Sequence, residues 1–260
     1  SYNEYVCQIH AYQHIELRTL ERGYLQNIYV DEGQFVKKGT LMFKIMPLVY
    51  QAEAQTAQAE ANYAEIEYLN TKSLADSNIV SKNELALAKA KFDKAKAEYS
   101  LAQTHLGFTE IRAPFDGIMD HFYVRLGSLL EEGELLSTLS DNSKMWVYFN
   151  VPEAEYLNYI SKKPDQDTKV KLRMANGEEF SNPGKVETIE ADFNNETGNI
   201  AFRATFANQK GILRHGETGD VLMPVTLKNV LIIPQKATFE VLDKKFVYVI
   251  DKDNIVKSRE

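Results

Sequence analysis

Five histidines, one cysteine, an acidic cluster and two methionines are the side chains of this sequence that could do chemistry. Histidines bind metal ions when their spacing brings ring nitrogens together or when carboxylates accompany them. The histidines here follow no ligand spacing and have no acidic partner pattern, which favours surface or core roles over metal ligation. They are His10, His14, His105, His121 and His215.

The acidic cluster and the methionines also favour structural roles. Glu131, Glu132 and Glu134 surround a glycine at an expected turn, where carboxylates are normally solvated, whereas acid–base catalysis needs burial. Met42 and Met46 lie on one face of an expected strand, and isolated methionines usually fill gaps in a core rather than bind soft metals. We therefore predict no bound metal at either place.

Composition excludes further classes of protein. The sequence contains no phosphate-binding loop, dinucleotide fingerprint, nucleophile elbow or zinc-binding helix motif, so we predict that it is not an enzyme. A net charge of -7 opposes nucleic-acid binding. Cys7 lies in an alternating strand pattern, which favours a buried small hydrophobe over a reactive or lipidated thiol. No segment approaches the roughly 20 apolar residues that cross a bilayer, and any leader peptide lies outside this sequence.

An internal repeat organises the elements. Segment 23–33 aligns with segment 117–127: each has a glycine, an apolar strand that ends in Tyr-Val, and a second glycine. Each half, about 33 residues long, is too small to bury a core alone. We expect the two halves to pack as one small β-sandwich similar to the biotinyl/lipoyl carrier fold, with Gly33 and Gly127 in equivalent turns.

A helical insertion separates the halves. Residues 48–106 contain no proline or glycine and are rich in good helix formers. In the second half of the insertion, apolar residues recur at spacings of three and four: Leu85, Ala88, Phe92, Ala95, Tyr99, Ala102 and Leu106. The first half has a stripe of smaller residues, Ala54, Ala57, Ala61, Ala64 and Tyr68. Three further residues, Ala52, Ala59 and Ile66, are expected to broaden this apolar face.

The insertion is predicted to fold back on itself. Asp76-Ser77-Asn78 interrupts the helical pattern, and Ser81 followed by Glu84 predicts a capping box that starts a second helix. The result is an antiparallel helical hairpin that projects from the sandwich. It occupies the place where carrier domains have their modified lysine, and no Met-Lys-Met or Asp-Lys-Ala motif is present.

Strands dominate the rest of the chain. Asp141-Asn142-Ser143 predicts a turn, after which a strand at 145–151 and a short helix at 152–160 follow. Turn sequences separate four more strands, which predict a small β-barrel: 170–174, 184–191, 200–206 and 221–227. A last β unit is expected from strands at 230–234, 237–241, 245–250 and 255–256, and we assign the N-terminal strand 5–11 to this end of the molecule.

This order of elements, over essentially the whole chain, resembles the AcrA/MexA-type periplasmic adaptors, or membrane fusion proteins, of RND multidrug efflux pumps. Segment 109–117 resembles the family's Thr-x-Ile-x-Ala-Pro-x-x-Gly motif. Segment 213–217 resembles its Leu-x-Pro-Gly-Met loop, with His215 in place of proline and Glu217 in place of methionine. Segment 230–234 resembles its apolar strand that ends in proline.

The resemblance implies a mainly β, elongated multidomain fold with a long α-helical hairpin. The expected domains are an N-terminal strand of the membrane-proximal or barrel region at 1–13, a first lipoyl half at 14–47, the hairpin at 48–106, a second lipoyl half at 107–140, the β-barrel at 141–228 and an incomplete membrane-proximal β domain at 229–260.

The resemblance also implies a binding site at the hairpin tip for a TolC-like outer-membrane channel. The family uses an arginine, a leucine and a serine there, and the matching positions are Asn70, Leu74 and Ser81. Asn70 departs from the pattern because it carries no charge, so we expect either that Lys72 supplies the cation or that the contact is remodelled for another channel. Lys82 is a further candidate contact residue. Ser81 is explained equally well as a helix N-cap, and Leu74 has a second interpretation as tip packing.

The implied function is that of a non-catalytic periplasmic adaptor without cofactors. It links a proton-driven inner-membrane RND transporter to the outer-membrane channel for export of drugs and toxic compounds. The resemblance further implies self-association into a ring, expected to be a hexamer built as a trimer of dimers, and an inner-membrane anchor in an N-terminal segment outside this sequence. Three alternatives stay open: an adaptor for an ABC-type export system, a biotin or lipoyl carrier component, and a plain coiled-coil dimer.

Overall fold

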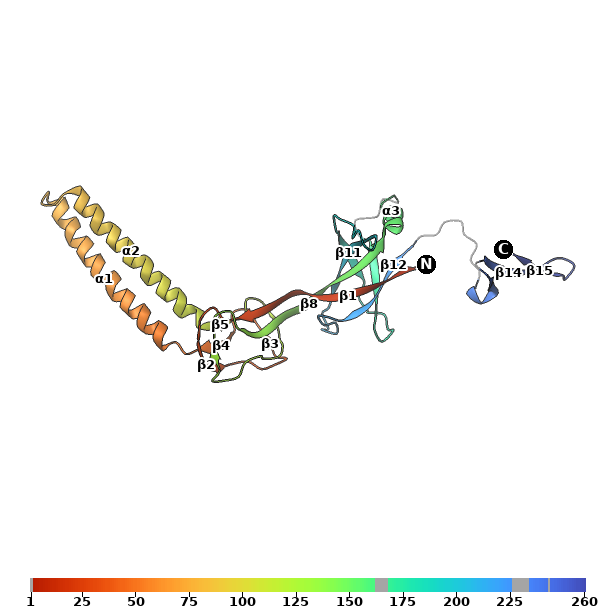
Figure 1. Cartoon of the computed structure of the whole chain (residues 1–260), viewed down its shortest axis with the longest axis horizontal. Coiled ribbons are helices and arrows are strands. Elements are labelled where there is room, and N and C mark those ends of the chain that lie inside the picture. The colour runs from red at the N-terminus through yellow and green to blue at the C-terminus, as the bar shows by residue number, and fades with distance from the viewer. Residues whose placement is uncertain (1, 162–167, 226–233, 243) are drawn as a thin grey trace. The chain divides into compact units, whose positions relative to one another are not determined.

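The computed structural model describes residues 2–161, 168–225, 234–242 and 244–260. The chain divides into a large unit, Glu4–Leu222, and a small unit that contains the segment from Met223 to Glu260 together with the first three residues. Sheets of eight, four and three strands and one long helical hairpin make up most of the described residues (Figure 1). The prediction of a mainly β fold with a helical hairpin is confirmed.

The two repeat copies build one β-sandwich in the large unit. One sheet has the order β5-β4-β2-β7, and the pair β3–β6 continues into β8. The strands are β2 (Gly23–Ile28), β3 (Phe35–Val36), β4 (Leu41–Ile45), β5 (Glu110–Arg112), β6 (Gly117–Met119), β7 (Leu129–Leu130) and β8 (Leu135–Pro152). Side chains from both copies fill a common core, in which Met42, Phe43, Ile45, Leu130, Leu136 and Leu139 have no solvent exposure.

Hydrogen bonds between the copies follow a two-fold pattern. A shift of 94 positions relates Gly33 to Gly127 and Leu25 to Met119. The Gly33 amide donates to the Met119 carbonyl at 2.9 Å, and the Gly127 amide donates to the Leu25 carbonyl at the same distance. The two glycines have φ angles of 75° and 83°, in the left-handed region that glycine tolerates. The prediction that they occupy equivalent turns of one sandwich is confirmed.

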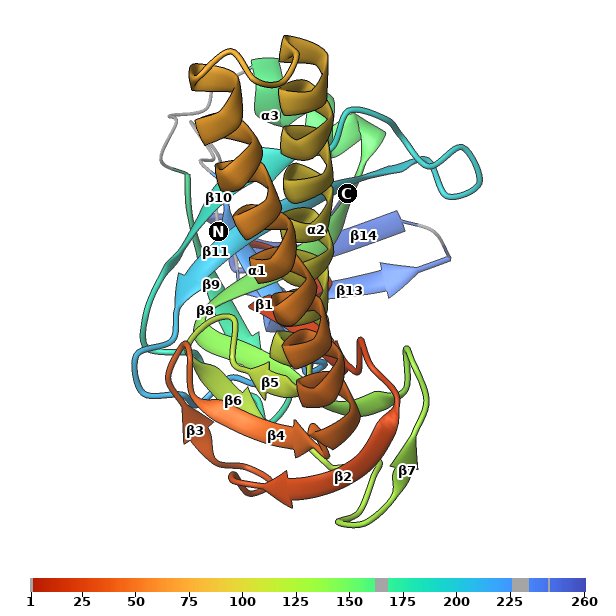
Figure 2. The ribbon, with the colours of Figure 1, turned by 90° about the vertical axis from the view of Figure 1, so that its left-hand side faces the viewer.

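The hairpin consists of α1 (Leu48–Asp76) and α2 (Lys82–Phe108), which lie side by side (Figures 1 and 2). The predicted stripe of α2 is buried or half-buried throughout. It packs on alanines of α1, with the Tyr68 and Phe92 rings stacked at 5.9 Å. Small residues let the two backbones approach closely, so the seam is narrow.

The width predicted for the α1 stripe is wrong. Ala52, Ala59 and Ile66 are exposed rather than buried. Each lies two positions from a residue of the seam, and two positions correspond to about 200° around a helix of 3.6 residues per turn. These residues therefore point away from α2, and α1 has apolar side chains on two faces.

The other large sheet closes on itself. Its order is β1-β12-β9-β10-β11-β8, and β1 also pairs with β8, so the six strands form a circuit. The strands besides β8 are β1 (Tyr2–Arg18), β9 (Lys169–Met174), β10 (Gly184–Ile189), β11 (Asn199–Ala207) and β12 (Thr218–Pro224). Helix α3 (Glu153–Ser161) follows β8 directly. Cys7 is 2% exposed in this sheet, and burial raises the pKa of its thiol to about 12.

The turn predicted at Asp141-Asn142-Ser143 is wrong. β8 runs through these residues, because β1 pairs with β8 along most of the length of β8. Backbone groups that would hydrogen-bond within a turn find their partners on β1 instead. The polar residues form a β-bulge instead, since the register jumps from Ala11↔Met145 to Gln13↔Asp141. β1 and β8 thus run as long continuous strands across residues 13 and 140, where domain boundaries were predicted.

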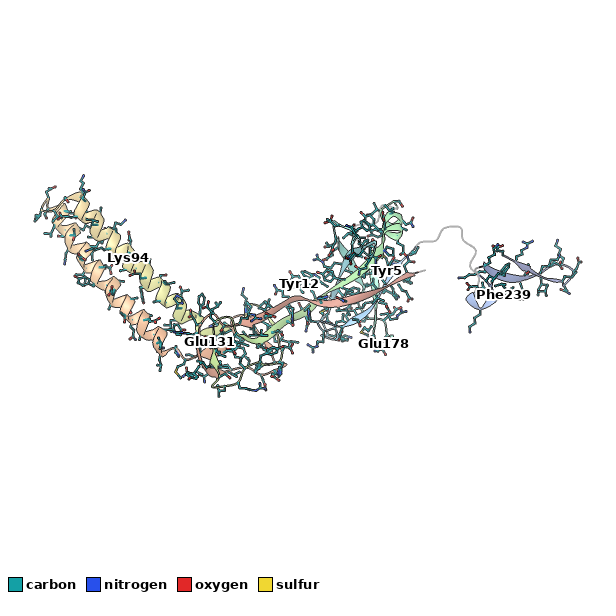
Figure 3. The ribbon with its side chains drawn as sticks, viewed as in Figure 1. Tyr5, Tyr12, Lys94, Glu131, Glu178 and Phe239 are labelled. Atoms are coloured by element: carbon teal, nitrogen blue, oxygen red, sulfur yellow. The ribbon has the colours of Figure 1, made fainter. Side chains whose placement is uncertain are left out.

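The small unit contains a three-stranded antiparallel sheet of β13 (Thr238–Val241), β14 (Lys244–Ile250) and β15 (Val256–Arg259), after the short η1 helix (Gln235–Ala237). Phe239, which is labelled in Figure 3, stacks on Phe246 and Tyr248 with ring centroids 5.8 and 4.3 Å apart. Of the strand predicted at 230–234, residues 230–233 lie outside the described residues. The strand predicted at 5–11 is in the closed sheet, paired with β8, and not in this one.

Candidate partner-binding surface

The tip of the hairpin is a tight connection between α1 and α2. α1 ends at Asp76, and Asn78 turns the chain with a φ of 56°. The predicted capping box is confirmed: the Glu84 amide donates to Ser81 Oγ at 3.2 Å, and the Ser81 amide donates to Glu84 Oε2 at 2.9 Å. Both ends of the connection are therefore defined by local hydrogen bonds.

The predicted tip residues all lie on the exposed part of the hairpin. Asn70, Lys72 and Leu74 are on the last two turns of α1, Ser81 caps α2, and Lys82 is its first residue. Leu74 is 42% exposed. The Ser81 side chain is exposed but already engaged in the capping box, so its structural role is accounted for without a partner.

Ile79 is a tip residue that the sequence prediction left out. It is 68% exposed, more than Leu74, and its amide donates to the Leu74 carbonyl at 2.9 Å. That backbone hydrogen bond holds the two residues close together, and both have exposed apolar side chains at the tip. An isoleucine between two helices, directly after a turn residue and outside the heptad pattern, was the available signal.

Each helix also has an exposed stripe at heptad spacing on its outer face. On α1 the stripe is Val49, Ala52, Thr56, Ala59, Tyr63, Ile66 and Asn70, and on α2 it is Leu87, Ala90, Lys94, Ala97, Leu101, Thr104 and Phe108. Lys94 is the one charged residue among these fourteen positions (Figure 3). An outer face of a solvated hairpin normally has charged residues there. These stripes have the composition of a helix–helix contact.

The residues around the two stripes have opposite charge. α1 contains five acidic residues and one lysine, for a net charge of -4, whereas α2 contains five lysines and three acidic residues, for a net charge of +2. Ion pairs inside the hairpin are exposed and few, as in Lys91–Glu67 at 3.3 Å. Most of this charge is therefore available to a neighbour.

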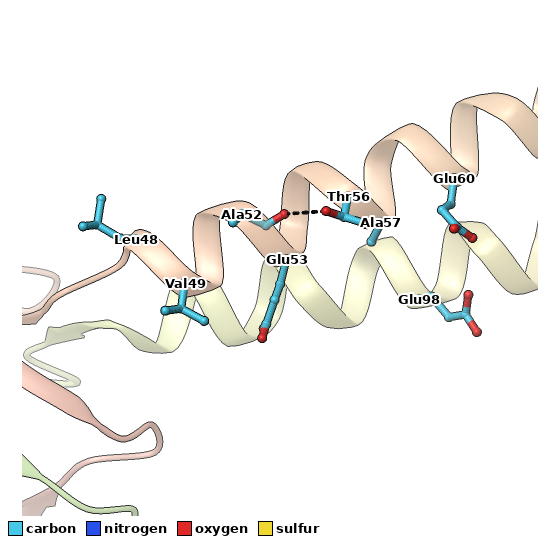
Figure 4. Close-up of a pocket in the computed structure, with 8 residues that line it drawn as sticks. All are labelled: Leu48, Val49, Ala52, Glu53, Thr56, Ala57, Glu60 and Glu98. Carbon is cyan, nitrogen blue, oxygen red and sulfur yellow. Dashed lines mark hydrogen bonds between the residues drawn. The ribbon is translucent and has the colours of Figure 1, made fainter.

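A shallow groove lies at the base of α1, lined by Leu48, Val49, Ala52, Glu53, Thr56, Ala57, Glu60 and Glu98 (Figure 4). Its floor is apolar, and Thr56 Oγ1 donates to the Ala52 carbonyl at 3.0 Å, which leaves the threonine methyl as part of the surface. Three carboxylates edge the groove.

Three of the five histidines come together, which corrects the prediction that they are scattered. His14 and His215 stack at 3.9 Å between ring centroids, and His10 meets His215 edge to face at 5.1 Å. β1 and the turn before β12 are distant in sequence but adjacent in the sheet, so spacing alone could not reveal the cluster. Among the described residues no group of three or more histidine, cysteine or acidic side chains has a metal-binding arrangement.

No helix within the described ranges is long and apolar enough to cross a membrane.

Comparison with solved structures gives the class of protein that this fold defines. A MacA–MexA chimera that contains the Pseudomonas aeruginosa MexA hairpin matches with a TM-score of 0.71 and 22% identity, over 86% of this chain and 82% of that one. MacA from Actinobacillus actinomycetemcomitans matches with a TM-score of 0.54 and 21% identity, over 100% and 88%. The fold of this chain is therefore similar to that of MacA and of the MacA–MexA chimera.

Sequence comparison extends this result. Residues 144–227 match the family described as "RND MFPs, beta-barrel domain". The efflux pump periplasmic linker BepD of Brucella suis is 26% identical over 98% of this chain and 71% of its own length, and MexA of Pseudomonas aeruginosa is 25% identical over 96% and 68%. Residues 144–227 are therefore similar to the β-barrel domain of RND membrane fusion proteins, and the chain as a whole is similar to efflux pump periplasmic linkers.

Proposed function

We propose that this protein is the non-catalytic periplasmic adaptor of a tripartite efflux pump. It links a proton-driven RND transporter in the inner membrane to a TolC-like channel in the outer membrane, and the pump exports drugs or toxic compounds. The observation that carries the proposal is the hairpin: a self-contained pair of helices, inserted between the halves of a sandwich, with an exposed apolar tip. The names of the relatives, which are periplasmic linkers of efflux pumps, support it.

The modules then have separate tasks. We assign 14–47 and 107–140 to a lipoyl-like sandwich, 141–228 with the N-terminal strand to a β-barrel, and 229–260 to part of a membrane-proximal domain. A segment that precedes this sequence anchors the protein to the inner membrane. The family match over 144–227 favours an RND transporter over the ABC-type partner that the sequence left open.

Self-association into a ring, a hexamer in this proposal, is supported by the two outer stripes of the hairpin. The stripes differ from each other and lie on different helices, so the α1 stripe of one copy can meet the α2 stripe of the next. Such a head-to-tail contact closes into a ring when the rotation fits. The opposite net charges of the two helices favour this arrangement over contacts between two like faces.

Side-chain sizes are complementary as well. Within the hairpin Tyr68 is level with Phe92. The base of the hairpin lies at lower residue numbers in α1 and at higher residue numbers in α2. Nine positions from this pair toward the base, Ala59 is level with Leu101, and sixteen positions from it, Ala52 is level with Phe108. Between neighbouring parallel hairpins, a large side chain thus meets an alanine at each of these levels. Small-to-large packing of this kind is what a close helix–helix contact requires.

Disulfide cross-linking tests the contact between copies. The double variant Ala59→Cys with Leu101→Cys should form a ladder of covalent oligomers on oxidation, because each chain offers one thiol to each neighbour. The buried Cys7 should not interfere. Asn62→Cys with Ser100→Cys, at similar levels but off the stripes, is the matched control. Monomers only, or equal ladders from both variants, would contradict the proposed seam.

The function itself is tested in cells. Deletion of the gene should raise susceptibility to the compounds that the neighbouring transporter exports, and the intact gene should restore resistance. Deletion of the transporter should have the same effect, with no further increase in the double deletion. Unchanged susceptibility of the adaptor deletion under conditions where the transporter deletion is sensitive would contradict the proposal.

A further inference from the structure

The histidine cluster lies at the bulge between β1 and β8. His10 pairs with Trp146 just before the register jump, and His14 pairs with Ser140 just after it. His215, in the turn before β12, lies against both other rings. Three imidazoles from two separate segments therefore meet where the two longest strands of the protein are irregular. Tyr12, the β1 residue opposite the bulge, is labelled in Figure 3.

The hydrogen bond of His215 requires a neutral ring. The Ala11 amide donates to Nδ1 of His215 at 3.2 Å. An imidazole nitrogen accepts a hydrogen bond only with a free lone pair, so the ring proton of His215 is on Nε2. The next proton can bind only at Nδ1, the atom that accepts from Ala11. Protonation of His215 is therefore incompatible with this contact between the turn and β1.

The surroundings also oppose a positive charge on His215. Its pKa is lowered by burial, and next by the charges that His14 and then His10 would carry. His14 Nδ1 is 2.7 Å from Ser140 Oγ, and His10 packs edge to face on Tyr148 at 5.4 Å. Other charged side chains on the same elements are Asp141, Lys144, Arg214 and Glu217. Asp141 accepts from the Ser143 amide, and Lys144 lies over the Tyr12 ring.

Segment 208–217 clamps the bulge from both sides. At one end Asn208, which is 2% exposed, donates through Nδ2 to the Asn142 carbonyl at 2.8 Å, and its amide donates to the Ser143 carbonyl at 2.9 Å. At the other end the His215 side chain accepts from the Ala11 amide of β1, and two backbone hydrogen bonds of 2.8 Å join the segment to Ile9 of β1: the Gly216 amide donates to the Ile9 carbonyl, and the Ile9 amide donates to the Glu217 carbonyl. The Asn208 end is buried and has no titratable group, and the bonds to Ile9 join backbone groups, so the side-chain contact between His215 and Ala11 is the part that can open with pH.

We propose that His10, His14 and His215 form a proton-operated latch, in which the His215 side chain is fastened to the Ala11 amide of β1 when neutral and is released on protonation. The ligand of this site is a proton at Nδ1 of His215. Release removes the side-chain contact with Ala11 next to the bulge of the β1–β8 pair, while the backbone bonds to Ile9 remain, so the stiffness of this strand pair depends on pH. The proposal does not depend on the partners of the protein, so the experiment that tests it is independent of the tests of the adaptor function.

The direction of the pH effect follows from the geometry. The folded protein binds the proton more weakly than an unfolded chain does, so the latch contributes its full stability above about pH 6.5, the pKa of an unperturbed histidine. The contribution is lost as the pH falls through the lower pKa of the folded state. The latch therefore opens in acid and closes again on neutralisation.

Trp146 is a built-in reporter for this change. It is the only tryptophan of the chain, it pairs with His10, and its ring lies 5.1 Å from Tyr12. Titration of the intact protein from about pH 8 to about pH 5 should give one reversible change in Trp146 emission, with its midpoint below the pKa of an unperturbed histidine. His215→Gln keeps an acceptor for the Ala11 amide but cannot titrate, so it should abolish the change.

Two further variants complete the experiment. His121→Gln, at an exposed histidine of the sandwich, should keep the wild-type titration. His14→Asn removes one of the rings that oppose a charge on His215, so it should move the midpoint of the Trp146 titration to higher pH. This variant also tests the proposal if His215→Gln does not fold. A flat wild-type titration, an unchanged transition in His215→Gln, or an unmoved midpoint in His14→Asn would each overturn the latch.

Discussion

At the scale of single residues, Ser81 has two candidate roles: it caps α2, and it is a predicted contact residue for a partner. Its side chain already accepts a hydrogen bond from the Glu84 amide, so the helix cap explains the serine without any contact to a channel. Other side chains can replace the serine in this task, because aspartate is an equally good N-cap. This chemical equivalence makes the two interpretations distinguishable.

Ser81→Ala should destabilise the hairpin by about 1 kcal/mol, and Ser81→Asp should restore most of that stability. Thermal unfolding of the purified proteins measures both effects. Export by cells with Ser81→Asp then isolates the second role: parental export assigns Ser81 to the cap alone, and reduced export at equal stability assigns it to a partner contact as well.

Leu74 has no comparable structural task. Its side chain is 42% exposed, and it lies next to Ile79 at the tip. Leu74→Gln should change the free energy of unfolding by no more than about 0.5 kcal/mol, as is usual for exposed positions, while it lowers drug resistance of the cells. Leu69→Gln, at a 52% exposed leucine further along α1, is the control and should leave resistance unchanged. Equal resistance of both variants at equal expression would remove Leu74 from the channel contact.

At the scale of elements, the seam of the hairpin determines its stability. Phe92 stacks on Tyr68 and packs against the alanines of both helices. Phe92→Ala should cost about 1–3 kcal/mol, less than a fully buried phenylalanine, because a two-helix seam is only partly shielded from water. Leu101→Ala, on the exposed stripe of α2, should cost much less in the isolated protein. Chemical denaturation, followed by the helix signal in circular dichroism, measures the free energy of unfolding of both variants. Equal losses of stability in Phe92→Ala and Leu101→Ala would contradict the assignment of inner and outer faces.

Periodicity made the elements with local signals predictable. The α2 stripe, the Ser81–Glu84 box and the paired turns at Gly33 and Gly127 are each determined by a few neighbouring residues, and all three agree with the structure. The turn expected at Asp141-Asn142-Ser143 failed because β1, from the other end of the chain, pairs across it. The histidine cluster was missed for the same reason, since His14 and His215 meet only after the sheet has formed.

The candidate site was only partly predictable. Resemblance selected Asn70, Leu74 and Ser81, but not Ile79, whose exposure depends on how the helices end. The apolar residues Ala52, Ala59 and Ile66 were assigned to the wrong face, because composition shows that a helix is apolar but not how many faces are covered. Knowledge of the seam was needed to recognise the outer stripe.

At the scale of the whole molecule, the proposal requires separate modules with separate partners. In this proposal the hairpin contacts neighbouring copies along its outer stripes and an outer-membrane channel at its tip. The proposal assigns the closed sheet and the small β unit to the inner-membrane side. A ring would present many tips to the channel at once, which multiplies the effect of each contact.

The most direct test of this account is site-specific photo-cross-linking in cells from Ile79 at the tip. A photoreactive amino acid at this position should yield a covalent product that contains this chain and an outer-membrane channel protein, identified by mass spectrometry of the product. The same amino acid at Tyr24, exposed on the sandwich, should yield no such product. Absence of the channel from the Ile79 product, in cells where the pump is active, would contradict the central claim.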